Sequence, residues 1–333
     1  MIKKKSDLPK RLQYLKEVYF NAKPSITIGH ALAFTEIAKK YPDIPRNVLR
    51  AKGFRRACET APMLIQEQEL IVGHPCGKPR AGSFSPDIAW EWVRDELDTI
   101  STRSQDPYFI SEEDKKVMRE ELFPFWKGKS LAEECEKAFR KEDLWEFGAQ
   151  ACISDLTYHM TSGGGDTSPG YDIILFKKGI CGIKADAEAY LTGLSTDTIE
   201  DRDKISFYQA EIETCEGILT YAARLSIYAW ELFEKEKDPK RKSELKKIAE
   251  VNAHVPANPP ETFHEALQAI WTIQSLFLMA DNQSSTSLGR IDQYVLPCYE
   301  SDIENGRLSE ELYLSSEKWF FPMLVDYTSI FKP

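Results

Sequence analysis

The sequence predicts a soluble, mainly α-helical fold with few strands. Apolar residues make up 42% of the 333 residues and charged residues 29%, a balance typical of a globular protein with a sizeable core. Apolar residues recur at helical spacing through much of the chain, and helix-capping residues stand where these stretches begin. We therefore expect fewer than about a quarter of the residues in strands.

Two helix starts are recognisable in the N-terminal half. Ser85-Pro86 places a capping residue and a proline ahead of apolar residues at helical spacing over residues 88–100. Ser130 and Glu133 form a capping box, in which each residue satisfies a backbone N–H of the other, ahead of a second apolar stripe. Both patterns predict helices that begin at these residues.

The longest helix signals lie in the C-terminal half. An apolar stripe runs from Ile205 to Leu232, and this helix should end before Asp238-Pro239, which caps the next one. Thr262 and Glu265 form another capping box. The helix that they open is apolar over most of its circumference, so it should be covered on all sides.

Strand signals are few. The best candidates are Glu69–Gly73 and Tyr171–Phe176. Trp90, Trp92 and Trp271 stand on helical stripes and are expected in the core. The chain has no internal repeat and no evident linker, which favours one continuous domain.

Charge and composition exclude several classes of function. The net charge of −10 and a pI near 5.2 make nucleic acid an unfavourable partner. No apolar run reaches the roughly 18 residues of a membrane span, and the basic start lacks the apolar segment of a secretory signal. The odd number of cysteines, seven, without C-x-x-C spacing, indicates free and mostly buried thiols in the cytoplasm.

Several short sequences resemble known binding motifs, but each lacks a residue that the motif requires. Gly128-Lys129-Ser130 ends like a phosphate-binding loop, but Phe123 occupies the position of its first glycine. His264-Glu265 begins like a zinc-binding H-E-x-x-H, but Gln268 replaces the second histidine. We therefore predict no metal site and no nucleotide site.

The most unusual stretch is the loop over residues 157–172, which contains Gly163, Gly164 and Gly165 in a row. Consecutive glycines are unfavourable for folding and are tolerated where a backbone approaches a neighbour closely. Tyr158 and Asp166 flank the glycines, and an aromatic ring with a carboxylate suits a small cationic ligand. An ordinary loop with a surface aspartate is the other interpretation.

The segment from Asp155 to Gly179 resembles the substrate loop of choline trimethylamine-lyases, which are glycyl-radical enzymes similar to pyruvate formate-lyase. The Gly-Gly-Gly-Asp sequence marks that subfamily. Further segments agree with it at residues 8–20, 54–62 with 69–73, 79–90 and 287–294. The resemblance covers roughly residues 8–311.

The resemblance implies a fold and a site. Residues 1–333 would be the N-terminal portion of a pyruvate formate-lyase-like domain, a mainly helical fragment of a ten-stranded barrel surrounded by helices. Tyr158 and Asp166 would line the choline pocket, with the three glycines as support. His159 is then expected to be structural, and Arg290 with Asp292 to be an ion pair rather than catalytic groups.

The family's radical chemistry requires residues that these motifs do not supply. The resemblance implies a thiyl cysteine and an acid–base glutamate in a Gly-Cys-Val-Glu-like motif, and a radical glycine near the C-terminus, all expected beyond residue 333. The glycine-radical domain is thus absent, and residues 312–333, with Pro322, form an atypical tail. The glycyl radical would be installed by a radical-SAM [4Fe-4S] activating enzyme, with no cofactor bound in this fragment.

Three functions are compatible with these observations. The first is the N-terminal part of a choline trimethylamine-lyase, inactive alone, whose intact form cleaves choline to trimethylamine and acetaldehyde. The second is another glycyl-radical eliminase, such as a diol dehydratase. The third is a non-catalytic helical binding or scaffold protein. For the first two we expect a cytoplasmic protein that needs an activating enzyme; a homo-oligomer and a location within a bacterial microcompartment stay open.

Overall fold

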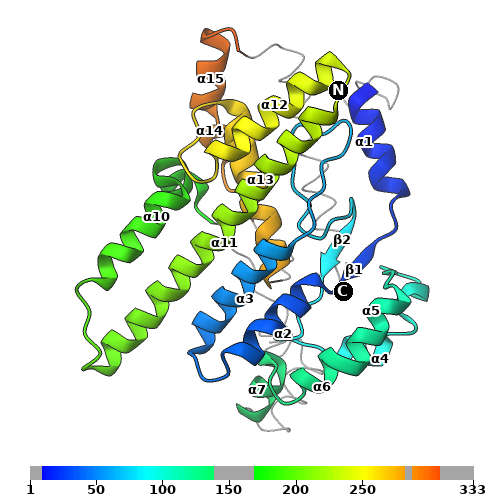
Figure 1. Cartoon of the computed structure of the whole chain (residues 1–333), viewed down its shortest axis with the longest axis vertical. Coiled ribbons are helices and arrows are strands. Elements are labelled where there is room, and N and C mark those ends of the chain that lie inside the picture. Colours follow the sequence, from blue (N-terminus) through cyan, green and yellow to red (C-terminus); the bar gives the residue numbers. More distant parts are fainter. Residues whose placement is uncertain (1–9, 139–168, 282–286, 308–333) are drawn as a thin grey trace.

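The computed structural model describes residues 10–138, 169–281 and 287–307, and helices dominate them (Figure 1). Within these residues two short strands pair in parallel, β1 (Ser25–Thr27) and β2 (Ala81–Ser83). The prediction of a mainly helical chain with few strands is therefore confirmed for the described residues. The barrel of the intact family stays an expectation, because two short strands do not establish it.

The N-terminal half surrounds these two strands with short helices. Two of its elements are single turns of other helix types, the 3₁₀-helix η2 and the π-helix η3. The elements are α1 (Lys10–Asn21), α2 (Gly29–Lys40), α3 (Arg46–Thr60), α4 (Glu91–Glu96), η2 (Ile100–Thr102), α5 (Glu112–Val117), η3 (Met118–Leu122), α6 (Phe123–Trp126) and α7 (Leu131–Ala138).

The C-terminal half is built from longer helices. A π-helical turn leads into an antiparallel hairpin, whose second helix crosses the molecule and packs on α3 (Figure 1). The elements are η5 (Tyr171–Leu175), α10 (Phe176–Leu191), α11 (Ile199–Lys235), α12 (Pro239–His254), α13 (Phe263–Asp281), α14 (Ile291–Tyr294) and α15 (Leu296–Glu304).

The predicted caps of the long helices are confirmed. The Asp238 side chain accepts a hydrogen bond of 2.7 Å from the Arg241 amide, so it begins α12 as expected. At the start of α13, the Glu265 amide donates to Thr262 Oγ1 (3.3 Å) and the Thr262 amide donates to Glu265 Oε2 (3.2 Å). These contacts are local in sequence, which is why a sequence pattern predicts them.

Both predicted strands are wrong. Residues 69–73 form a buried irregular segment, and residues 171–175 form the π-helical turn η5. The backbone of the first segment is bonded by side chains from distant helices instead of by a neighbouring strand. In the second, Gly170 adopts a left-handed conformation (φ 65°) that turns the chain directly into the helix.

The helix predicted from Ser85 begins later than expected. Residues 86–88 form a turn, and regular helix starts only at Glu91. Trp90 is buried (3% exposed) and so is Trp271 (2%), as predicted, but Trp92 is 49% exposed, so its assignment to the core was wrong. The short length of α4 explains this difference, because a helix of six residues against the core buries only one face, here that of Val93.

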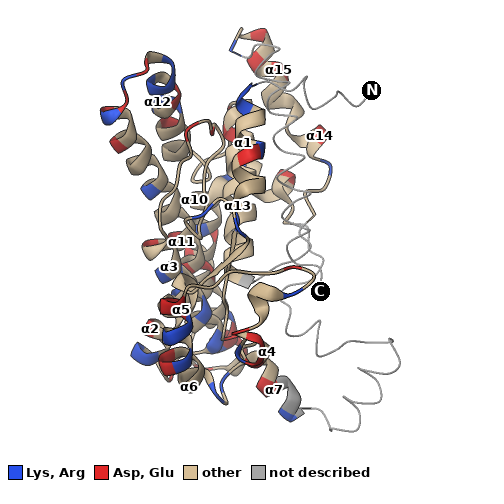
Figure 2. Cartoon of the chain, turned by 90° about the vertical axis from the view of Figure 1, so that its right-hand side faces the viewer, with Lys and Arg blue, Asp and Glu red and all other residues tan. Residues whose placement is uncertain are grey.

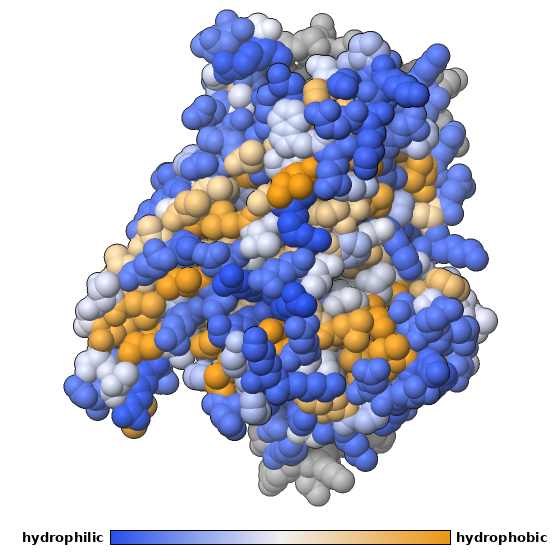
Figure 3. Space-filling model, in the orientation of Figure 1, coloured by the Kyte–Doolittle hydropathy of each residue, from blue (hydrophilic) through white to orange (hydrophobic). Residues whose placement is uncertain are grey.

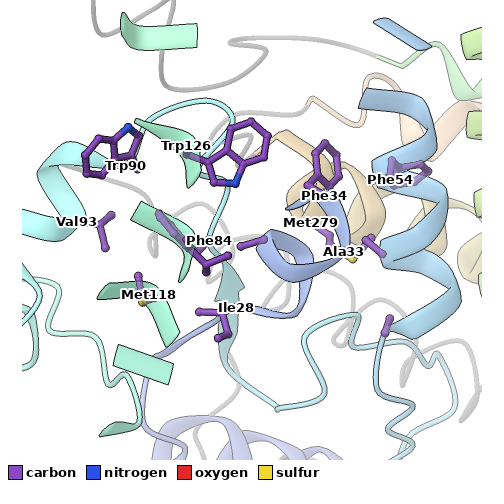
Figure 4. Close-up of a cluster of buried hydrophobic side chains, with 14 of the residues drawn as sticks. Ile28, Ala33, Phe34, Phe54, Phe84, Trp90, Val93, Met118, Trp126 and Met279 are labelled. Carbon is purple, nitrogen blue, oxygen red and sulfur yellow. The ribbon is translucent and has the colours of Figure 1, made fainter. Parts of the chain in front are cut away.

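The hydrophobic core has its largest cluster around α2, α3, α4 and β2 (Figure 4). Phe34 and Phe54 come from α2 and α3, while Trp126 of α6 closes the cluster and donates from Nε1 to Thr35 Oγ1 at 2.9 Å. A second cluster joins η5 and α10 to α13 and α14. A third lies between α11, α12 and the buried segment at residues 65–72.

Helix α13 lies at the centre of the molecule and is buried on nearly every side, as its sequence predicts. In Figure 2 it shows almost no acidic or basic colour, whereas the outer helices carry both charges. Its few polar residues, including Gln268, Thr272 and Gln274, are buried as well. Among the described residues no helix has the length and apolar character needed to cross a membrane.

Glycine is required at one kink. Gly179 interrupts α10 with φ 62°, and a Cβ atom there would lie 2.4 Å from the carbonyl oxygen of Ala257. The following amides of Ile180 and Cys181 donate to the carbonyls of Pro256 and Ala257. The kink therefore fastens α10 to the connection between α12 and α13.

Candidate functional site

The residues predicted to contact substrate, Tyr158 and Asp166, lie outside the described residues, as do His159 and Gly163–Gly165. The predicted site therefore stays a prediction, and its geometry is defined only by the elements on either side. Helix α7 precedes this segment and η5 follows it. Both flanking elements are fixed by specific contacts.

The start of α7 is fixed to the segment before α4. Glu133 accepts hydrogen bonds from the Ser130 amide (3.1 Å), the Gly128 amide (2.7 Å) and Trp90 Nε1 (3.2 Å). Burial alone would raise the pKa of Glu133, but these hydrogen bonds to its charged form outweigh burial and lower the pKa. The predicted capping box is thus confirmed, and it extends into a tertiary contact with the buried Trp90.

The start of η5 is fixed to α13. Tyr171 is buried (2% exposed), and its hydroxyl donates to Gln274 Oε1 at 2.8 Å. Burial raises the pKa of Tyr171 well above its ordinary value, so the phenol stays protonated and remains a donor. This π-helical turn follows the predicted substrate loop in the sequence, and π-helical turns are frequent at functional sites.

Tyr294 joins the same cluster from the Ser287–Tyr294 segment, which carries the family's Ser-Leu-Gly-Arg-Ile-Asp-Gln-Tyr sequence. Its ring lies 6.3 Å from that of Tyr171 and 5.3 Å from that of Phe176, and its hydroxyl donates to the Leu288 carbonyl at 2.7 Å. Two segments that the resemblance singles out, more than 100 residues apart, therefore meet against α13.

Arg290 and Asp292 form an ion pair, as predicted, with 3.6 Å between Nε and Oδ1. Both side chains are exposed (72% and 69%), so the pair contributes little to stability. Neither residue contacts the cluster around Tyr171 in a way that indicates a catalytic role.

Sequence reasoning did not identify Gln274, the partner of the Tyr171 hydroxyl, since a buried glutamine on an apolar helix has no local signal.

A second buried polar network holds the segment over residues 66–74. His74 Nε2 lies 2.6 Å from Glu69 Oε1, and Gln66 donates to both Glu69 oxygens, from its amide at 2.8 Å and from Nε2 at 2.6 Å. Burial would lower the pKa of His74, but the charge and hydrogen bond of Glu69 raise it overall. The network therefore pairs the buried His74 ring with the buried Glu69 carboxylate, and this pairing favours the charged form of the ring.

Helices α12 and α13 bind the backbone of this segment through side chains. Gln268 accepts from the Val72 amide (2.9 Å) and donates to the Val72 carbonyl (2.8 Å). Trp271 Nε1 donates to the Gly73 carbonyl at 3.0 Å, and Arg241 donates to the Glu69 carbonyl at 2.8 Å. These bonds replace the strand ladder that the sequence predicted, which is the physical reason for that error.

The described cysteines are free, and their burial is mixed. Cys58 and Cys215 are buried, whereas Cys181 is exposed. Burial raises the pKa of Cys76 to about 11 and of Cys215 to about 12, so these thiols stay protonated at neutral pH. Within the described ranges no three His, Cys, Asp or Glu side chains are grouped to hold a metal ion.

Comparisons with a family model and with curated proteins agree on one family. The model of the Pyruvate formate lyase-like family matches residues 4–314. Isethionate sulfite-lyase of Nitratidesulfovibrio vulgaris is 31% identical over 329 residues, which cover 96% of this chain and 40% of the relative. The chain spans about 40% of the length of the curated relatives it matches.

Solved structures agree with that family. A structure concerned with 1,2-propanediol dehydration in Roseburia inulinivorans superposes with a TM-score of 0.85 and 30% identity, covering 91% of this chain and 36% of the other. A glycyl radical enzyme from Archaeoglobus fulgidus superposes with a TM-score of 0.81 and 28% identity, covering 91% and 38%. The arrangement of helices around α13 is therefore similar to that of much longer enzymes.

Proposed function

The chain belongs to the Pyruvate formate lyase-like family of glycyl-radical enzymes, and we propose that it forms the N-terminal part of an eliminase acting on a small alcohol. The observation that carries this proposal is the chemistry shared by the relatives' substrates. Isethionate and 1,2-propanediol both bear a hydroxyl group one carbon away from a group that can leave, sulfite or water. The family relation also favours an enzyme over a non-catalytic scaffold.

Dehydration of a diol is the reaction that the comparisons support better than cleavage of choline. Removal of a hydrogen atom from the hydroxyl-bearing carbon, loss of water from its neighbour and return of the hydrogen atom convert 1,2-propanediol to propanal and water. The Tyr171–Gln274 hydrogen bond is compatible with such a reaction, because it holds η5 on α13 with two uncharged groups. Such a pair adds no charge that would attract water.

Choline is the second candidate because one sequence feature favours it. Asp166 directly follows the three glycines, and a quaternary ammonium has no N–H to donate, so it is held by carboxylates and ring faces. On this alternative Tyr158 supplies a ring and Asp166 the counter-charge. Trimethylamine would then leave in place of water, and acetaldehyde would form.

The radical itself is proposed to come from outside these 333 residues. No cysteine of the chain lies in the family's Gly-Cys-Val-Glu-like motif, and no Arg-Val-x-Gly-Tyr-like motif is present. On this proposal a longer form of the protein supplies the thiyl cysteine, the acid–base glutamate and the radical glycine, and a radical-SAM activating enzyme installs the radical. The 333-residue chain alone should then give no glycyl radical signal by electron paramagnetic resonance.

The decisive experiment compares substrates in the longer form, activated anaerobically with the activating enzyme and S-adenosylmethionine. We expect propanal from 1,2-propanediol at a higher kcat/KM than trimethylamine from choline. Trimethylamine as the main product would instead select the second candidate, and no product together with a confirmed radical would reject both. For the choline alternative, Asp166→Asn should raise the KM for choline by an amount corresponding to about 1–3 kcal/mol, with little change for the uncharged diol.

A further inference from the structure

The end of the α10–α11 hairpin farthest from α13 carries an exposed aromatic cluster. Tyr190 of α10 stacks on Tyr208 of α11 with 5.3 Å between ring centroids, and Phe207 meets Tyr208 edge-on at 5.4 Å. Tyr190 and Phe207 are 61% and 59% exposed, and Ile199, the first residue of α11, is 79% exposed. Adjacent exposed apolar side chains of this size are typical of an interaction surface.

The same region, residues 190–211 and hereafter the hairpin tip, is acidic. It contains five carboxylates and two basic side chains. Both basic groups are already engaged: Lys204 donates to Glu200 at 2.6 Å, and Arg202 donates to the Thr196 carbonyl at 2.7 Å. Within the described part of the chain, the other four carboxylates form no ion pair: Asp197, Asp201, Asp203 and Glu211.

The hairpin tip extends beyond its neighbours. Asn47, near the start of α3, donates to Ser206 Oγ at 3.2 Å and marks where α3 begins to cover α11. Figure 1 places the connection between α10 and α11 at the lower left, clear of the other labelled helices. In the same orientation, Figure 3 shows apolar residues interspersed with hydrophilic ones at this end of the hairpin. The aromatic cluster is therefore open to a partner.

We propose that the hairpin tip is a docking surface for a basic segment of a partner protein, one that carries Lys or Arg next to apolar side chains. Aromatic ring faces and unpaired carboxylates both attract cations, so the two features of the tip favour the same partner. A second copy of this chain is disfavoured, because it carries a net charge of −10 and would bring an identical acidic tip. An acidic or phosphate-rich partner is disfavoured for the same reason.

The test uses the full 333-residue chain and a synthetic probe, a 16-residue helical peptide with Lys on one face and Leu on the other. Binding is measured by isothermal titration calorimetry in 50 mM and 300 mM NaCl. Tyr190→Ala with Phe207→Ala should weaken binding about tenfold, since exposed aromatic anchors dominate such contacts. Asp197→Asn with Asp203→Asn should weaken binding about threefold in low salt and less in high salt.

The matched control removes one exposed ring and one charge elsewhere, Phe20→Ala with Asp43→Asn. It should change binding less than twofold. Equal losses in the control and the tip variants would overturn the proposal, because the peptide would then be bound by net charge alone. A dimer in sedimentation velocity that Tyr190→Ala with Phe207→Ala abolishes would also overturn it, and would assign the tip to a second copy. Circular dichroism verifies that each variant keeps its helices, as expected for exposed positions.

Discussion

Two buried histidines lie in different environments, and their comparison shows that burial alone does not determine the pKa of a ring. His30, on α2 in the N-terminal core, stacks on Phe34 with 4.2 Å between ring centroids. Neither of its ring nitrogens has a hydrogen-bond partner among the described residues. His74 is equally buried, but its Nε2 lies 2.6 Å from the Glu69 carboxylate.

The two rings consequently titrate in opposite directions. Burial, together with a smaller contribution from the nearby charge of Arg50, lowers the pKa of His30 to about 3. For His74 burial acts in the same direction, but the charge and hydrogen bond of Glu69 outweigh it and the pKa is raised. A neutral ring thus packs as a hydrophobic group in one region, while in the other a carboxylate favours the charged form of the ring and ties it to a polar segment.

The largest expected effect comes from breaking the polar region. Glu69→Ala removes the partner of His74 and both acceptors of Gln66, leaving buried polar groups unpaired. We expect the free energy of unfolding to fall by about 3–5 kcal/mol, measured by urea denaturation. Glu67→Ala, at an exposed position two residues before Glu69, is the control and should change the free energy of unfolding by less than about 0.5 kcal/mol.

A double substitution sharpens the same comparison. Glu69→Leu with His74→Leu removes both charges together, so it should cost less than the sum of the two single substitutions. Additive losses would mean that the two side chains do not interact in solution. The stability of residues 66–74 would then come from the hydrogen bonds between their backbone and the side chains of Gln268 and Trp271.

The contrast between the two regions also marks what the sequence could predict. Helix caps such as Asp238 and the Thr262–Glu265 box were predicted because their partners lie within four residues. The segment at residues 69–73 was mistaken for a strand, because its partner Gln268 lies 196 residues from Val72. Apolar pattern alone does not distinguish a strand bonded to a neighbouring strand from a segment bonded to side chains.

The candidate site likewise contains residues that the sequence predicted and residues that it did not. Tyr158 and Asp166 were chosen from composition and resemblance, and they stay predictions outside the described residues. The Tyr171–Gln274 bond was not foreseen, since Tyr171 was assigned to a strand and Gln274 lies on a helix that the sequence predicts to be mostly apolar. The N-terminal His30 likewise gave no signal, because an unpaired buried histidine is indistinguishable in sequence from an exposed one.

A smaller effect is expected from His30, and only in acid. Its folded pKa lies below the unfolded value of about 6.5, so between those values the unfolded chain binds more protons and stability falls as pH falls. His30→Phe removes this loss. The difference in free energy of unfolding between His30→Phe and wild type should be about 2 kcal/mol more in favour of the variant at pH 5 than at pH 7.5. A pH-independent difference would show that His30 is not shielded from solvent.

The smallest effect is expected from His74, and its sign is reversed. The folded pKa of His74 is raised, so its charged pair with Glu69 stabilises the protein fully below the unfolded value of about 6.5 and is lost as pH rises through the folded pKa. His74→Gln keeps a hydrogen-bond donor for Glu69 but removes the charge, so we expect a cost of about 1 kcal/mol at pH 6. That cost should shrink as pH is raised toward 9, whereas the His30→Phe difference changes as pH falls through the unfolded value of about 6.5. Urea denaturation of both variants and wild type across this range measures both slopes. A His74→Gln cost that grows with pH would mean that the folded ring is neutral, and the distinction between the two histidines would then be one of hydrogen bonding without charge.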